Sequence, residues 1–161
     1  MEKSLSLLEK IREEFFLEAK DIKVYSPLTL AFVGDCVFDL IIRTVMVERA
    51  NQPPHKLHQK KSKIVKASTQ AALAEAILEE LSEEEQGVYR RGRNAKSGTG
   101  AKNASIGDYR KATGLEALIG FWYLTGQEER MLVMIKAGLV KLNITIHGSS
   151  NDLLPDTKNN V

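Results

Sequence analysis

Three carboxylates set in apolar stretches are the residues of this chain that could do chemistry. Asp35 and Asp39 stand four residues apart in the stretch AFVGDCVFDLIIR. Because four residues is just over one helical turn, both would project from the same face of a helix. Glu116 is the only acid of a second apolar stretch, TGLEALIGFWYL. An unpaired carboxylate in apolar surroundings costs roughly several kcal/mol, so each acid should have a partner, such as a metal ion or an arginine.

The chemistry that such acids support is metal-assisted hydrolysis of a phosphodiester. Mg²⁺ takes oxygen ligands, typically one or two carboxylates together with waters and substrate phosphates. A bound Mg²⁺ can generate a hydroxide nucleophile and hold the oxygens of a phosphoryl group during displacement. We therefore expect a metal site formed by Asp35 and Glu116, with Asp39 as a further candidate ligand. The alternative is structural: Asp39 pairs with Arg43, and the other two acids pair with basic residues elsewhere.

Glycines accompany both acids and suggest how two helices could bring them together. Gly34 precedes Asp35, while Gly114 and Gly120 flank Glu116. A glycine inside a helix costs about 1 kcal/mol relative to alanine, so a packing reason is expected. We expect these glycines to let the two helices approach closely.

Two basic segments could bind nucleic acid. Residues 55–66 contain no acid, and residues 90–111 include a loop rich in Gly, Ser and Asn. The candidate nucleic-acid-binding residues are Lys56, Lys60, Lys63, Arg90, Arg91, Arg93, Lys96 and Lys102. Lys and Arg neutralise backbone phosphates without reading sequence, although a lysine-rich helix face can also be merely solvated. Because aromatic residues are scarce in both segments, a duplex backbone is a better expected partner than unpaired bases.

Two other features have simpler explanations than a functional site. His55 and His58 are spaced as zinc ligands can be, but lysines crowd them and no suitable third ligand is near. We interpret them as part of the basic surface. Cys36, the single cysteine, stands among apolar residues and is interpreted as a packing residue rather than a nucleophile.

The elements that must position these residues are helices throughout. Apolar residues recur at helical spacing, and start and stop signals separate the segments. Ser26-Pro27 opens a long helix that Pro53 and Pro54 end, and Ser82 with Glu85 forms a capping box. The expected helices cover residues 4–20, 26–49, 54–81, 82–93, 105–124 and 128–142. The predicted fold class is all-α.

Length and composition are those of one ordinary globular domain. The chain has 161 residues, a net charge of +2, 43% hydrophobic and 27% charged residues. A single cysteine rules out an internal disulfide framework and fits a reducing compartment. No apolar run is long enough to span a membrane, and the N-terminus lacks a signal-peptide core. We expect a cytoplasmic protein with a flexible tail at 145–161.

The motifs around the acids resemble those of the ribonuclease III family. AFVGDCVFDLIIR is similar to its catalytic helix, and TGLEALIGFWYL to its second acidic segment. The likeness is closer still to the small bacterial subfamily Mini-ribonuclease III, to which SPLTLAFVGD, RRGRNAKS and YRKATGLEALIG are also similar. The resemblance covers roughly residues 25–140.

This resemblance implies a ribonuclease III-like helical endonuclease domain over residues 1–144. It implies a homodimeric, Mg²⁺-dependent endoribonuclease (Mn²⁺ substituting) that cuts double-stranded RNA and leaves 5′-phosphate and 3′-hydroxyl ends. Asp35 and Glu116 fall on the catalytic, metal-binding acids of the family. The subfamily's associated task is maturation of the large-subunit (23S) ribosomal RNA precursor. Residues 94–108, with the basic segment before them, would clamp the RNA.

The sequence departs from the family pattern at two acidic positions. The larger enzymes have further acids where this chain has Ala31 and Thr113. Asp39, one turn beyond Asp35, could partly compensate for them. The alternative function is a non-catalytic RNA-binding or ribosome-assembly protein on the same fold.

Overall fold

The computed structural model describes residues 4–49, 51–96 and 105–146, and this part of the chain contains α-helices, two short 3-10 helices and no strand. The α-helices are α1 (Leu7–Glu14), α2 (Pro27–Arg49), α3 (Pro54–Val65), α4 (Ala67–Ile77), α5 (Glu83–Asn94), α6 (Ile106–Leu124) and α7 (Glu128–Lys141). The 3-10 helices are η1 (Ile22–Val24) and η2 (Leu78–Glu80). The predicted all-α fold class is confirmed.

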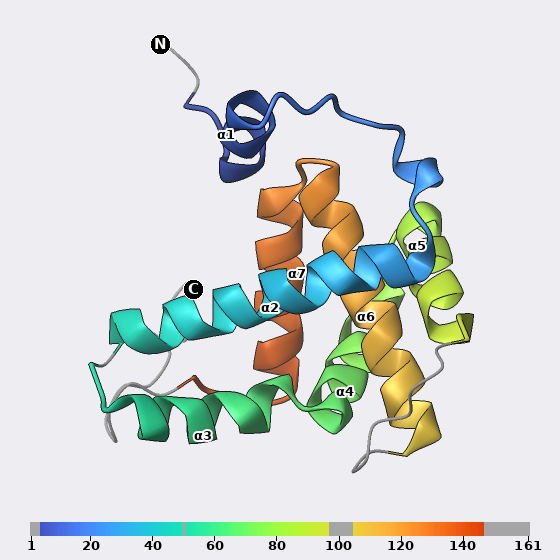
Figure 1. The fold of residues 1–161 in the computed structure, drawn as a ribbon. Helices are drawn as coiled ribbons and strands as arrows, with labels where there is room; N and C mark the ends of the chain where they lie inside the picture. Colours follow the sequence, from blue (N-terminus) through green and yellow to red (C-terminus); the bar gives the residue numbers. More distant parts are fainter. Residues whose placement is uncertain (1–3, 50, 97–104, 147–161) are drawn as a thin grey trace, which may run out of the picture.

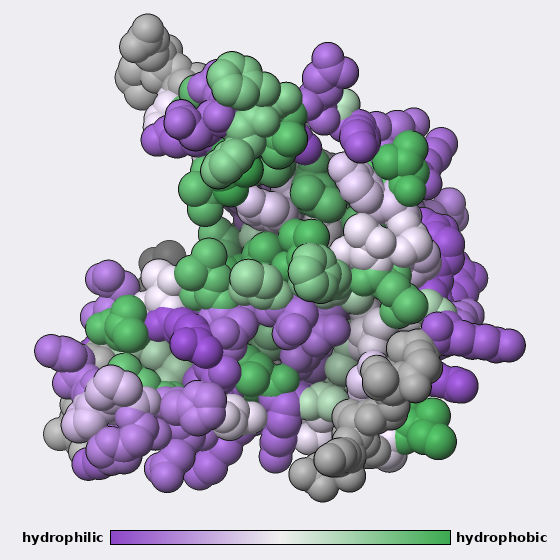
Figure 2. All heavy atoms as spheres, viewed as in Figure 1, coloured by the Kyte–Doolittle hydropathy of each residue, from purple (hydrophilic) through white to green (hydrophobic). Residues whose placement is uncertain are grey.

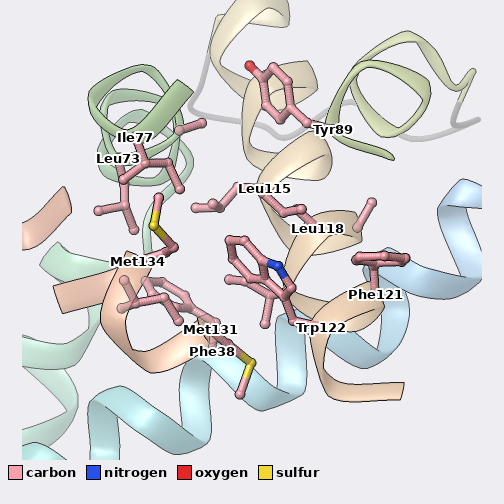
Figure 3. Packing of buried hydrophobic residues seen from close by; sticks show 14 of the residues in the cluster. Phe38, Leu73, Ile77, Tyr89, Leu115, Leu118, Phe121, Trp122, Met131 and Met134 are labelled. Atoms are coloured by element: carbon pink, nitrogen blue, oxygen red, sulfur yellow. The ribbon is translucent and has the colours of Figure 1, made fainter. Parts of the chain in front are cut away.

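Helix α6 runs through the middle of the bundle and contributes more buried residues than any other described helix (Figure 1). Leu115, Ala117, Leu118, Ile119 and Trp122 have no solvent-exposed surface. Around them pack side chains from α2, α4, α5 and α7, as Figure 3 shows for Phe38, Leu73, Tyr89 and Met134. From Ala112 onward α6 is apolar on most of its surface, and such a helix is expected to be surrounded by others.

Helix α2 lies across α6 and is buried on one side only. Phe38 and Ile42 face the core, whereas Phe32 is 81% exposed and Leu40 is 54% exposed. The apolar composition of this stretch would suit a helix at the centre of the bundle. The structure assigns that place to α6 and leaves α2 with an uncovered apolar face.

The predicted helix at 54–81 is wrong: the chain breaks at Lys66, whose backbone is extended (φ −64°, ψ 153°). Two side chains that follow the break donate hydrogen bonds to carbonyl groups that precede it. Thr69 Oγ1 donates to the Lys63 carbonyl (2.9 Å), and Gln70 Nε2 donates to the Val65 carbonyl (2.8 Å). Such bonds satisfy carbonyls that lose their helical partners at a helix end. The break lets α3 follow α2 while α4 packs on α6 (Figure 1).

The first helix is shorter than predicted. Helix α1 ends at Glu14 instead of residue 20, and Phe16 adopts a left-handed backbone (φ 53°) that ends it. Ser6 and Glu9 form a capping box at its start. A chain segment then leads from α1 to η1, so that α1 lies at one edge of the bundle (Figure 1).

The compact part of the chain extends slightly beyond the predicted boundary at residue 144. Ile146 is only 6% exposed, and its carbonyl accepts a hydrogen bond from Arg49 (2.7 Å). The remainder of the predicted tail, 147–161, lies outside the described residues. Among the described residues, no helix is both long and apolar enough to cross a lipid bilayer.

Candidate active site at the crossing of α2 and α6

Two glycines bring the backbones of α2 and α6 into direct contact. A Cβ atom on Gly34 would lie 1.7 Å from the Glu116 carbonyl oxygen, and one on Gly120 would lie 2.0 Å from the Leu30 carbonyl oxygen. No side chain fits at such distances, so only glycine permits this crossing. The predicted role of Gly34 and Gly120 is confirmed, and the crossing places Asp35 next to Glu116 in space.

The third glycine of this set has a different function. A Cβ atom on Gly114 would meet the ring and carbonyl of Tyr89 at 2.7–2.8 Å. Gly92 likewise allows α5 to approach Ala117 of α6. Gly114 therefore serves the contact of α6 with α5, and the prediction that it brings α6 close to α2 is wrong.

The two acids at the crossing differ in their surroundings. Asp35 is exposed in the single chain, whereas Glu116 is half-buried. Burial, followed by the negative charge of Asp35, raises the pKa of Glu116 from 4.5 to about 7, although a hydrogen bond from Gln70 lowers it in part. The unpaired acid expected in apolar surroundings is thus Glu116, while Asp35 stands beside it at the surface.

Gln70 is a site residue that the sequence reasoning missed. It is 3% exposed and lies on α4, anchored by its bond to the Val65 carbonyl and hydrogen-bonded to Glu116. Its Oε1 atom is buried and has no hydrogen-bond partner among the described residues. The available signal was a glutamine opening the otherwise apolar run QAALA, but no sequence pattern connects it with Glu116.

The residues at the crossing fit a hard divalent cation with few protein ligands. Two carboxylates meet there, and the unpartnered Gln70 Oε1 can accept a hydrogen bond from a metal-bound water. No group of three or more His, Cys, Asp or Glu side chains suited to a metal occurs in the described ranges. Ala31 and Thr113, where the larger enzymes carry acids, are both buried, and Thr113 Oγ1 donates to the Tyr109 carbonyl.

Asp39 forms ion pairs with two basic side chains. Its Oδ2 atom accepts from Arg43 Nε at 2.6 Å, and its Oδ1 atom lies 3.2 Å from Lys61 Nζ. The pairing with Arg43 that was set against a metal-binding role is therefore present. Lys61, on α3, is an additional partner that no helical spacing could have indicated.

The basic residues lie towards the two ends of α2. Lys56, Lys60 and Lys63 belong to α3, beside the second half of α2, whereas the arginines belong to α5, beside its start (Figure 1). Arg90, Arg91 and Lys96 are exposed, and Arg93 lies over the Tyr89 ring, 5.9 Å from its centroid. Lys102 and most of the predicted clamp loop lie outside the described residues.

The two simpler interpretations have different outcomes. His55 and His58 are exposed on the basic helix α3, which agrees with their interpretation as part of the basic surface. Cys36 is exposed, so its interpretation as a packing residue is wrong. The error follows from treating α2 as buried on all sides, when the face bearing Cys36 is uncovered.

Comparison with known proteins agrees with this arrangement of helices and acids. The model of the family described as "Ribonuclease III domain" matches residues 28–127, a range that includes both acids of the crossing. The chain belongs to the ribonuclease III family.

The more detailed resemblance is to proteins named Mini-ribonuclease 3. The one from Clostridium tetani is 42% identical over 141 residues, covering 87% of this chain and 90% of that protein. Those from a Thermoanaerobacter species and Staphylococcus aureus are 46% and 43% identical and cover 81% and 76% of this chain, and 91% and 92% of their own lengths. The predicted resemblance to Mini-ribonuclease III is confirmed.

A solved structure has the same fold. Protein FN1578 from Fusobacterium nucleatum superimposes with a TM-score of 0.69 at 33% identity, over 77% of this chain and 98% of that one. The family and these relatives together support a double-stranded RNA endoribonuclease.

Proposed function

We propose that this protein is a Mg²⁺-dependent endoribonuclease that hydrolyses double-stranded RNA with Asp35 and Glu116, leaving 5′-phosphate and 3′-hydroxyl ends. The observation that carries the proposal is the glycine-enforced crossing of α2 and α6, which sets two acids side by side. Burial and the neighbouring charge raise the pKa of Glu116 to about 7. A cation between the acids would relieve that repulsion.

Each residue of the crossing has a distinct task in this proposal. Asp35 and Glu116 would hold the ion, and Gln70 would fix Glu116 and accept a hydrogen bond from a bound water. When bound, Mg²⁺ or Mn²⁺ supplies an activated water and neutralises charge on the phosphodiester. Because both Asp39 oxygens are already paired, we leave Asp39 out of the ligand set.

The basic helices would bind the duplex through its backbone. Exposed cations on α3 and α5 lie towards opposite ends of α2, with Asp35 between them along the helix. An RNA duplex presents phosphates and 2′-hydroxyl groups rather than readable base edges, so binding would follow helix shape. We infer a ribosomal RNA precursor stem, that of the large subunit (23S), as the substrate, and the cytoplasm as the place of action.

We also propose that the protein acts as a homodimer. Large apolar side chains are uncovered on α1, α2 and the segment after α1, including Phe15, Phe16, Phe32 and Leu40. Figure 2 shows apolar surface over α1 and along α2, with a hollow between them. Contiguous apolar surface of this kind is typical of an interface, and a second copy would bury it.

Incubating the protein with an end-labelled RNA duplex tests the proposal. With Mg²⁺ the duplex should be cut, and with excess chelator it should remain whole. The absence of acids at Ala31 and Thr113 favours the alternative, a non-catalytic RNA-binding protein on this fold. That alternative predicts duplex binding without cleavage under both conditions.

A further inference from the structure

Beside the acid pair, one carboxylate joins α2 to α3 by holding two cations. Asp39 stands one turn beyond Asp35 on α2 and binds Arg43 from the same helix and Lys61 from α3. The side chains of Lys61 and Asp39 are 14% and 30% exposed, whereas that of Arg43 is 57% exposed. The cluster carries one net positive charge and, in the single chain, is open to solvent on the arginine side.

A pocket lies against this cluster. It has a volume of about 280 Å³ and is lined by Arg43, Met46, Val47, Pro54, Leu57, His58 and Lys61. One part of the lining is basic and the other is apolar. Such a lining suits an anion attached to a less polar body, as a phosphate is attached to ribose.

Asp39 determines where the donors of Arg43 lie. Its Oδ2 atom takes the Arg43 Nε hydrogen, and the terminal guanidinium N–H groups donate to no acceptor in the described part of the chain. An exposed arginine has many rotamers, and fixing one of them lowers the entropy lost on binding. Asp39 is therefore suited to be a positioning residue for a phosphate-binding arginine.

We propose that this pocket binds a backbone phosphate of the RNA strand near the scissile one, with Arg43 and Lys61 as donors and Asp39 as the positioning residue. Arg43 stands eight residues beyond Asp35, about 12 Å along the helix axis, a distance that a few nucleotides of one strand can span. The inference rests on the proposed function, because it names a contact of the same duplex substrate. It also gives Asp39 a role distinct from metal binding.

A phosphate-neutralisation experiment tests this contact. Duplexes carrying one neutral methylphosphonate at successive positions around the cleavage site are bound to the protein in chelator, where they stay intact. For wild-type protein, neutralising one particular phosphate should weaken binding about tenfold. For Arg43→Ala, the unmodified duplex should bind about tenfold more weakly, and neutralising that phosphate should change nothing further.

Two further variants separate positioning from simple charge. Asp39→Asn removes a negative charge, so electrostatics alone predicts tighter binding of every duplex. If Asp39 positions Arg43, neutralising that particular phosphate should weaken binding by Asp39→Asn by less than half the factor seen for wild-type protein. Lys10→Ala, on the distant helix α1, removes one exposed positive charge and should leave the phosphate pattern unchanged.

Thermal melting shows which variants are folded, and Arg43→Lys replaces Arg43→Ala if the latter is not. Lysine keeps the charge but loses the fork geometry, so the position-specific effect should still shrink. An unchanged phosphate pattern in a folded Arg43 variant, or tighter binding with an intact pattern for Asp39→Asn, would overturn the inference. Failure of the proposed function looks different: wild-type protein would then cut no duplex, whatever its phosphate pattern.

Discussion

Two carboxylates withdrawn from solvent in this protein, the buried Glu85 and the half-buried Glu116, have opposite surroundings. Burial would raise the pKa of Glu85, but hydrogen bonds from Arg130, the Ser82 backbone and Trp122 outweigh it and lower the pKa from 4.5 to about 2. Glu116 faces another acid instead of a cation, and its pKa rises to about 7.

The difference separates a group that stabilises the fold from one that is suited to chemistry. Glu85 joins α5 to α6 and α7 through partners that are all protein groups. Glu116 is left without a cationic partner in the described residues, and its charged form is disfavoured until something positive arrives. Replacing the carboxylate with an amide should therefore have opposite effects on stability at the two positions, and should impair catalysis at Glu116 only.

The largest expected effect is on catalysis. Glu116→Gln should lower the rate of duplex cleavage by about 10³-fold or more, because removing a metal ligand removes charge stabilisation in the transition state. Glu85→Gln should leave the rate per folded molecule within about threefold of wild type. Single-turnover cleavage, corrected for the folded fraction, measures both. Comparable rate losses in the two variants would remove the distinction.

The crossing that sets Asp35 beside Glu116 can be broken directly. Gly34→Ala would put a methyl group 1.7 Å from a backbone oxygen, forcing the helices apart. We expect it to lower the free energy of unfolding by about 3 kcal/mol and to abolish cleavage. Gly107→Ala is the matched control, since its Cβ would meet nothing closer than 4.0 Å. Equal stability of the two variants in urea unfolding would contradict the crossing.

Removing the charge of Glu85 should cost stability in a pH-dependent way. Because its pKa is lower in the folded state, the charged form stabilises the protein above pH 4.5, and this contribution disappears as the pH falls towards 2. Glu85→Gln should therefore unfold about 2–3 kcal/mol more easily than wild type at pH 7. The gap should narrow below pH 4, as followed by urea unfolding. A constant gap would show that the charge of Glu85 is not what stabilises the fold.

Glu116→Gln should change the free energy of unfolding in the opposite direction and by a smaller amount. With a pKa of about 7 in the folded state, Glu116 destabilises the metal-free protein as the pH rises from 4.5 to 7. The amide removes this penalty, so without metal the variant should be about 2 kcal/mol more stable at pH 8 and equally stable at pH 4. Lower stability of the variant at pH 8 would mean that Glu116 has a cationic partner.

The helices that hold these acids were largely predictable from sequence, because caps and periodicity are local signals. The capping box of Ser82 and Glu85 and the proline start of α2 are both present. The break at Lys66 was not predictable, since it depends on α4 packing against α6. The second function of Glu85 was equally hidden, because Arg130 lies 45 residues away in sequence.

At the site, the sequence indicated the two acids, and it indicated that Gly34 and Gly120 let two helices approach closely. It did not indicate which of the two acids is the less exposed. That depends on α2 being uncovered on one side, which its apolar composition conceals. Gln70 and Lys61 approach from α4 and α3, so that only the folded chain brings them to Glu116 and Asp39.

Metal binding as a function of pH tests the central claim most directly. In calorimetric titration with Mg²⁺ or Mn²⁺, affinity should be highest at pH 8 and should fall about tenfold per pH unit below pH 7, because the ion displaces a proton from Glu116. Asp35→Asn and Glu116→Gln should abolish this binding, and Glu85→Gln should leave it unchanged. Equal affinity at pH 5.5 and pH 8, or undiminished binding by Glu116→Gln, would contradict a cation held between the two acids.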